Sequence, residues 1–127
     1  MGATFKRLGP KIVKRTGYYN CGPTLAHWCP ACKEMHDFAV DQPFGNGARW
    51  TWNENPAAPS FTPSMNIRIG PYPEGCHRAG TTEVCHYFLK DGQIQFLTDC
   101  THDLAGKVVE LPDIPATALK YATEESA

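Results

Sequence analysis

Two cysteine-containing segments of the sequence have the residue types and spacing of a metal site. The segment WCPACKEMH holds Cys29 and Cys32 in a Cys-x-x-Cys loop. A tight loop of this kind lets two sulfurs bind one tetrahedral ion. One such loop supplies only half of a tetrahedral zinc site. The segment CHYFLKDGQIQFLTDCTH adds Cys85 and Cys100, and we expect it to supply the other half.

The second segment has the pattern of a β-hairpin. Asp91 and Gly92 lie between two β-prone runs and predict a two-residue type I′ turn. The resulting register gives the opposed pairs Leu89–Ile94, Tyr87–Phe96 and Cys85–Thr98. Because side chains alternate along a strand, this register predicts that Cys85 and Cys100 share one face and that His86 points to the other.

The preferred zinc ligands are therefore four thiolates, from Cys29, Cys32, Cys85 and Cys100. His36, Cys76 or His86 is an alternative for one of them. A redox role for the Cys-x-x-Cys loop is less consistent with the sequence, because strand patterns flank the loop and no long amphipathic helix follows it. A single zinc ion would join an early turn to a late hairpin and so stabilise a small domain.

Serine and histidine side chains near this hairpin have the types needed for nucleophilic catalysis. Ser64 lies at the entry to a predicted strand, where its side chain can be held rigidly. A serine becomes a useful nucleophile when a general base is adjacent. His86 or His102 is the candidate base, and Asp99 or Asp103 would orient the imidazole.

The region between residues 41 and 64 is rich in turn residues and is typical of a loop that lines a site. Backbone N–H groups of residues 45–55 or 56–63 are candidates for an oxyanion hole. Ser60 and Ser64 each follow a proline, and turn hydroxyls often hydrogen-bond backbone N–H groups. That structural role is the alternative for both serines.

Composition favours a small, mostly β, single domain. The 127 residues include 11 glycines and 11 prolines, which favour short strands and many turns. The formal net charge of −1 argues against nucleic-acid binding, and no apolar run is long enough to cross a membrane. Short strands are expected at residues 24–28, 34–40, 48–52, 65–69 and 107–111.

Three regions follow from these patterns. Residues 1–20 contain five basic residues and no acidic one, and form a basic arm or edge strand. Residues 21–114 form the zinc-binding β domain, in which antiparallel strands and hairpins surround a zinc-ribbon-like cysteine site. Residues 115–127 form a short helical or irregular tail.

Several of these motifs together resemble the BubE proteins, which are encoded beside bacterial ubiquitin-like conjugation genes, and related bacterial and phage proteins. WCPAC, PSFTPSM, CHYFLKDGQIQFL and DCTH carry the resemblance, which covers roughly residues 24–112. It implies a zinc-containing peptidase that processes ubiquitin-like proteins with a serine in catalysis. The positions implied for catalysis are Ser64, His86 and His102, and those implied for zinc are Cys29, Cys32, Cys85 and Cys100.

The predicted function is thus a zinc-stabilised, peptidase-like hydrolase that acts on a ubiquitin-like or other protein in the cytoplasm of a bacterium or phage-infected cell. One alternative is a non-catalytic zinc-ribbon adaptor that binds a partner through Phe44, Trp50 and Trp52. A second is a hydrolase whose zinc is catalytic, with Glu34, Glu54 or Glu83 as its base.

Overall fold

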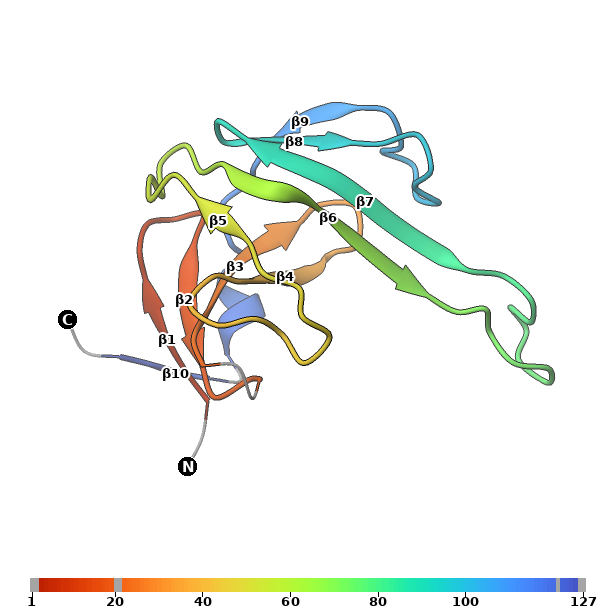
Figure 1. Ribbon diagram of the computed structural model, residues 1–127, viewed down its shortest axis with the longest axis horizontal. Coiled ribbons are helices and arrows are strands. Elements are labelled where there is room, and N and C mark those ends of the chain that lie inside the picture. The colour runs from red at the N-terminus through yellow and green to blue at the C-terminus, as the bar shows by residue number, and fades with distance from the viewer. Residues whose placement is uncertain (1–2, 20–21, 121, 126–127) are drawn as a thin grey trace.

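The computed structural model describes residues 3–19, 22–120 and 122–125 of the chain. It confirms a mostly β fold, built from two five-stranded sheets (Figure 1). In spatial order the first sheet contains β10 (Thr123–Glu124), β1 (Thr4–Arg7), β2 (Val13–Thr16), β3 (Thr24–Cys29) and β4 (Glu34–Ala39). The second contains β5 (Thr51–Trp52), β6 (Phe61–Ile69), β7 (Glu83–Lys90), β8 (Gln93–Phe96) and β9 (Val108–Glu110).

The main hydrophobic core lies between the two sheets. Phe38 of β4 stacks on Phe61 of β6 with ring centroids 4.0 Å apart. Tyr87, Leu89 and Phe96 add fully buried side chains from β7 and β8. Burying these large side chains drives the association of the sheets. The core therefore holds β3 and β4 against β7, and this contact positions the site.

A smaller cluster covers the far face of the first sheet. Phe5, Val13 and Ala26 pack there against Ile114 and Leu119. Leu119 belongs to the short 3-10 helix η1 (Ala116–Leu119), and β10 follows and pairs in parallel with β1. Within the described ranges, no helix has the length and apolar character needed to cross a membrane.

The predicted hairpin register is confirmed near its turn, where Leu89 pairs with Ile94 and Tyr87 with Phe96. The predicted pairing of Cys85 with Thr98 is wrong, because β8 ends at Phe96 and the chain turns away. Among the other expected strands, 24–28, 34–40 and 107–111 match β3, β4 and β9 to within two residues. The run at 48–52 forms only the short β5, whereas the run at 65–69 is the second half of a longer β6.

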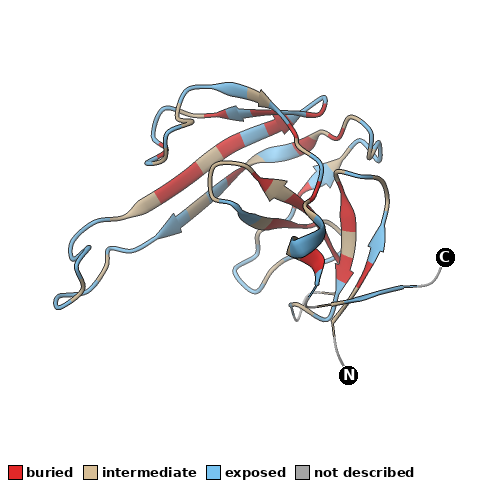
Figure 2. Cartoon of the chain, turned by 180° about the vertical axis from the view of Figure 1, so that it is seen from behind, coloured by how far each residue is buried: buried red, intermediate tan, exposed pale blue. Residues whose placement is uncertain are grey.

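Strands β6 and β7 form a long ribbon that extends beyond the rest of the second sheet (Figure 1). Exposure alternates along β7, as the bands in Figure 2 show. Cys85 and Tyr87 are buried on the face toward the first sheet, and His86 between them faces outward. The two faces of β7 therefore contribute to two different groups of side chains.

Candidate functional site

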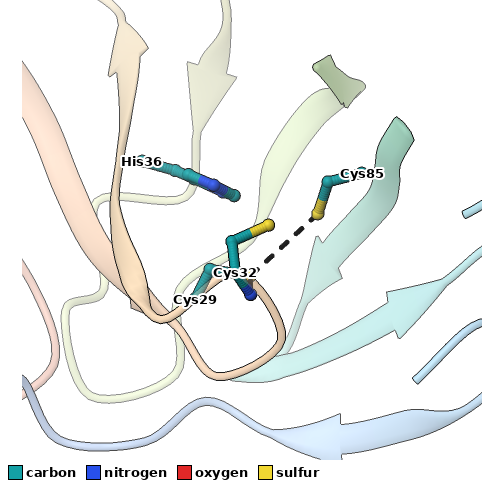
Figure 3. A group of neighbouring side chains, drawn as sticks. All are labelled: Cys29, Cys32, His36 and Cys85. Atoms are coloured by element: carbon teal, nitrogen blue, oxygen red, sulfur yellow. Dashed lines mark hydrogen bonds between the residues drawn. The ribbon is translucent and has the colours of Figure 1, made fainter. Parts of the chain in front are cut away.

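Three cysteines and one histidine from both sheets converge at the inner face of β7. Cys29 ends β3, Cys32 lies in the following turn, His36 is on β4 and Cys85 is on β7 (Figure 3). Their ligand atoms all lie within 4.8 Å of one another. The Sγ atoms of Cys29 and Cys85 are 4.0 Å apart, close to the separation of about 3.8 Å between thiolates on tetrahedral zinc. This group could hold a metal ion.

The turn after β3 prepares Cys29 for a ligand role. The backbone N–H of Cys32 donates to Cys29 Sγ at 3.4 Å, and the N–H of Lys33 donates to the Cys29 carbonyl at 2.8 Å. Hydrogen bonds from the thiols of Cys32 and then Cys85 lower the pKa of Cys29. Metal binding requires thiolates, so these contacts favour the binding-competent form of Cys29.

A chain of buried hydrogen bonds orients His36. The Tyr87 hydroxyl lies 2.6 Å from His27 Nε2 and 3.0 Å from His36 Nδ1. Burial lowers the pKa of His27 to about 4 and raises that of Tyr87 well above its usual value, so His27 is neutral and Tyr87 keeps its proton. His27 Nδ1 is 3.1 Å from the Trp28 carbonyl, which can only accept.

The protons along this chain can be ordered in one consistent way. His27 Nδ1–H donates to the Trp28 carbonyl, the Tyr87 hydroxyl donates to His27 Nε2, and His36 Nδ1–H donates to Tyr87. The remaining nitrogen of His36, Nε2, is then a lone-pair donor for a metal. Such outer hydrogen bonds commonly fix the ring of a metal-binding histidine. Sequence reasoning gave no role to His27 or Tyr87, because no local pattern distinguishes them from ordinary core residues.

Cys100 lies outside the group of possible ligands, although it was preferred as the fourth ligand. Its thiol donates to the His86 carbonyl at 3.1 Å and accepts from the His86 N–H at 3.2 Å. The early end of β8 explains this position, because Cys100 is no longer on a strand paired with β7. His36, named as an alternative from its spacing after Cys32, stands in its place, whereas Cys76 and His86 are not in the group.

The outer face of β7 carries a serine–histidine–aspartate arrangement. Ser64 Oγ on β6 is 3.1 Å from His86 Nε2. His86 Nδ1 is 3.1 Å from Asp99 Oδ2 and 3.3 Å from Oδ1. The cross-strand pairing of Asn66 with His86 aligns the two strands so that the serine can reach the imidazole.

Charge and hydrogen bonding set the protonation of this arrangement. The hydrogen bond from His86 lowers the pKa of Asp99, so the carboxylate is ionised at neutral pH and can only accept. His86 therefore carries its proton on Nδ1, and Nε2 accepts from the Ser64 hydroxyl. That is the arrangement in which an imidazole can take a proton from a serine.

Arg68 is a further member that the sequence did not predict. Its Nη2 donates to Asp99 Oδ2 at 3.3 Å. The side chains are partly open to solvent, with relative exposures of 21% for His86, 42% for Asp99 and 53% for Arg68. Solvent therefore screens the interaction between His86 and Asp99.

The other predicted candidates lie elsewhere. His102 lines a cavity of about 670 Å³ together with Cys32, His36 and Cys85. Its Nδ1 accepts from the Leu104 N–H at 3.2 Å, and Nε2 is buried with no hydrogen-bond partner among the described residues. Of the two histidines expected beside the serine, the structure places His86 in that position.

Ser60 is the other serine in the loop region between residues 41 and 64. It has the turn role considered from the sequence. Its Oγ accepts from the Asp91 N–H at 2.7 Å and donates to Asp91 Oδ1 at 3.4 Å. The Ser60 side chain thus joins this loop region to the β7–β8 turn. Asp99 is the aspartate that meets His86, and Asp103 makes no such contact in the part of the chain described.

Comparison with known proteins identifies one family. Residues 3–97 match the family described as bacterial ubiquitination-like system serine protease (BubE). No curated protein and no solved structure matches the chain. The matched residues include Ser64, His86 and the four members of the cysteine–histidine group, and they end just before Asp99. Because the match covers most of its length, the chain belongs to the BubE family of serine proteases of bacterial ubiquitination-like systems.

Proposed function

We propose that the protein is a serine peptidase in which Ser64 is the nucleophile, His86 the general base and Asp99 the residue that holds His86 in place. The observation that carries this proposal is the hydrogen-bond chain from Ser64 Oγ through both nitrogens of His86 to Asp99. Side chains in this order perform acyl transfer on several unrelated folds.

The reaction follows from these contacts. Ser64 Oγ forms a bond to the carbonyl carbon of the substrate amide while its proton passes to His86 Nε2. The tetrahedral intermediate then breaks its C–N bond, and His86 returns the proton to the leaving amine. Water attacks the resulting ester, with His86 again taking a proton and passing it to Ser64. Asp99 stays ionised and stabilises the imidazolium throughout.

We assign a structural zinc ion to Cys29, Cys32, His36 and Cys85. Three thiolates and one imidazole are a common set for structural zinc. These four side chains would complete a tetrahedral shell, which leaves no position for a water nucleophile. Bound there, the ion would supply a cross-link between β3, β4 and β7. This assignment makes zinc catalysis through Glu34, Glu54 or Glu83 the less favoured alternative.

The proposed substrate is a ubiquitin-like protein or a conjugate of one, as the family description supports. We place the reaction in the bacterial cytoplasm. The five cysteines in the described part of the chain are free thiols, which is consistent with a reducing compartment.

Ser64→Ala tests the proposal directly. We expect turnover of a bacterial ubiquitin-like protein, extended at its C-terminus by a fluorescent reporter, to fall by about 10⁴-fold. Labelling by a fluorophosphonate probe, which reacts with activated serines, should disappear. The circular dichroism spectrum and metal content should not change, because Ser64 lies on the opposite face of the sheet from the cysteines.

Ser60→Ala is the matched control. Ser60 lies in the same loop region, but its hydroxyl contacts Asp91 and not a histidine, so labelling and turnover should persist. Undiminished turnover or labelling of a folded Ser64→Ala variant would refute the serine mechanism.

A further inference from the structure

One long edge of the second sheet has no partner strand beside the proposed nucleophile. On that side of β6, β5 pairs only with Phe61 and Thr62. Beyond Thr62, no strand in the described ranges pairs with the outer side of β6. The free stretch includes Ser64 and runs along the ribbon to Ile69 (Figure 1).

Hydrogen bonds of β7 show which way the backbone groups of β6 point. The carbonyls of Val84 and His86 accept from N–H groups on the β8 side of the ribbon, at 3.0 and 2.9 Å. Backbone groups alternate in direction along a strand. The intervening residues Cys85 and Tyr87 therefore point their N–H and C=O groups toward β6.

The partners of these two residues on β6 are Ile67 and Met65. Their backbone groups point to β7, so those of Asn66 and Arg68 point outward from the sheet. The free edge thus offers two N–H groups and two carbonyls in the alternating pattern that an incoming strand requires.

A cavity lies at the start of this edge. Its volume is about 380 Å³, and its lining includes Ser64 and Asn66 together with Phe44, Trp50 and Met65. Trp50 Nε1 donates to the Ser64 carbonyl at 3.3 Å, which fixes the indole as one wall. Phe44, Trp50 and Met65 give the cavity an apolar part next to Ser64, and Arg49 and Asn46 add polar groups to its lining.

We propose that the substrate binds as an extended polypeptide strand along the outer edge of β6, with an apolar side chain next to the scissile bond in the cavity beside Ser64. This inference rests on the proposed function of Ser64. Ser64 and Arg68 are four residues apart on the strand, a span of about 13 Å, so the edge pairs with about four substrate residues. Pairing of this kind takes affinity from main-chain hydrogen bonds and specificity from side-chain pockets.

The edge also defines the class of substrate. A chain can add to a sheet edge only if its own backbone groups are unpaired. The enzyme therefore acts on flexible tails or linkers, not on the hydrogen-bonded interior of a folded domain.

The first experiment uses a library of unfolded peptides from a bacterial proteome, with the cleaved ends identified by mass spectrometry. We expect cleavage at sites that carry a large apolar residue at one fixed position beside the broken bond. Cleavage without any such preference would overturn the role of the cavity. The fastest-cut peptide then serves as the probe for the variants below.

Asn66→Pro removes one outward N–H, and a proline is tolerated at an edge where the N–H faces solvent. We expect kcat/KM for the probe peptide to fall by at least about fivefold, because a pairing hydrogen bond is lost and the ring obstructs the edge. The rate of fluorophosphonate labelling of Ser64 should stay within about twofold, since this small probe does not pair with the edge.

Two controls isolate the N–H group. Asn66→Ala removes the same side chain but keeps the N–H, so the loss of kcat/KM in Asn66→Pro is measured relative to this variant. Val108→Pro places a proline on β9, the opposite edge of the same sheet, where Val108 is exposed. Val108→Pro should cleave the probe peptide like the wild type. Wild-type cleavage by a folded Asn66→Pro variant would overturn the proposal.

N-methylation of single amides in the probe peptide gives a second test that does not depend on protein folding. Cleavage should slow when alternate amides on one side of the scissile bond are methylated, because alternate residues of a strand face the same partner. A uniform effect along the peptide would overturn the proposal.

The outcomes also separate this inference from the proposed function. Wild-type protein that reacts with the fluorophosphonate at Ser64 but cuts no peptide would overturn strand binding and leave the serine mechanism standing. Wild-type protein that neither reacts nor cuts would overturn both.

Discussion

The two faces of β7 differ in almost every physical property although the residues that define them are adjacent. On the inner face Cys85 is 4% exposed and meets three other buried or partly buried possible ligands. On the outer face the side chain of His86 is 21% exposed and contacts an aspartate that is 42% exposed. The side chains on the inner face are buried, as expected for a structural cross-link. Those on the outer face are open to solvent, so a substrate can reach them.

Electrostatics follow the same division. Burial raises the pKa of Tyr87 on the inner face, which keeps that group neutral. On the outer face the hydrogen bond from His86 lowers the pKa of Asp99, which keeps that group charged. Neutral groups with defined hydrogen bonds suit the orientation of a metal-binding histidine, and an ionised carboxylate suits the stabilisation of an imidazolium. Variants at consecutive positions of one strand can therefore test stability and activity separately.

The largest effect is expected for Cys85→Ala, which removes one of the proposed ligands from the inner group. Structural zinc can contribute about 10 kcal/mol or more to folding, comparable to the whole stability of a small domain. We expect the variant to lose its metal and its cooperative thermal transition, measured by elemental analysis and circular dichroism.

Cys100→Ser is the matched control for that experiment. The serine hydroxyl can keep the contacts with the His86 backbone, so metal content and the melting transition should be retained. Loss of metal from the Cys100→Ser variant, with metal retained by Cys85→Ala, would reverse the assignment of ligands.

The next largest effect is expected for His86→Ala on the outer face. Removing the proposed general base should lower peptidase turnover by about 10⁴-fold, while metal content and thermal stability change little. Turnover of the ubiquitin-like fusion and a melting curve are the measurements. His77→Ala, in the loop between β6 and β7, should behave like the wild type. A His86→Ala variant that unfolds and loses its metal would show that the two faces are not separable.

Asp99→Asn should have an intermediate effect. The amide cannot stabilise an imidazolium as a carboxylate does, so we expect kcat to fall by about 10- to 100-fold with little change in KM. The loss should be smaller than for a fully buried aspartate, because the pair is exposed and screened. Asp99→Glu should restore part of kcat, and an unchanged kcat for Asp99→Asn would remove Asp99 from the mechanism.

The pH dependence of this pair has a definite sign. Because the folded-state pKa of Asp99 is lowered, its contribution to stability is present above the unfolded-state pKa of about 3.9. It is lost as pH falls through the folded-state value. The difference in melting temperature between wild type and Asp99→Asn should therefore narrow in acid, as pH falls below about 3.9.

The smallest effect is expected for Tyr87→Phe, which removes the hydroxyl between His27 and His36. Loss of an outer hydrogen bond to a metal ligand commonly weakens metal binding by about tenfold or more. Competition with a chelating dye measures this change. Turnover of the zinc-loaded variant should be close to that of the wild type, since Tyr87 faces away from Ser64. Unchanged metal affinity would contradict the orienting role of Tyr87.

Local patterns in the sequence predicted much of this arrangement. Asp91 and Gly92 specify the hairpin turn, and its register together with strand alternation places Cys85 and His86 on opposite faces. The Cys29–Cys32 loop is a short-range motif that needs no tertiary information. Ser64, His86 and Asp99 were named as candidates from residue type and position, and the hydrogen bonds that join them are present.

What the sequence could not predict depends on where strands end and how the sheets pack. No residue type before Cys100 shows that β8 stops at Phe96, and extending the hairpin therefore misplaced Cys100. The contact between β4 and β7 brings His36 to Cys85 over a long sequence separation, so spacing alone left it as one alternative among three. The contact of Arg68 with Asp99 likewise appears only once the ribbon and the turn after β8 are in place.

The alternation of faces along β7 also has a genetic consequence. Gain of one codon between those for His86 and Tyr87 would shift the first part of β7 by one residue relative to the hairpin and exchange the faces of the residues before the insertion. Cys85 would then point to solvent and His86 into the core, so one in-frame change would disrupt both the proposed metal site and the proposed base. A substitution at either position affects one face only, whereas a change in the length of this stretch affects both.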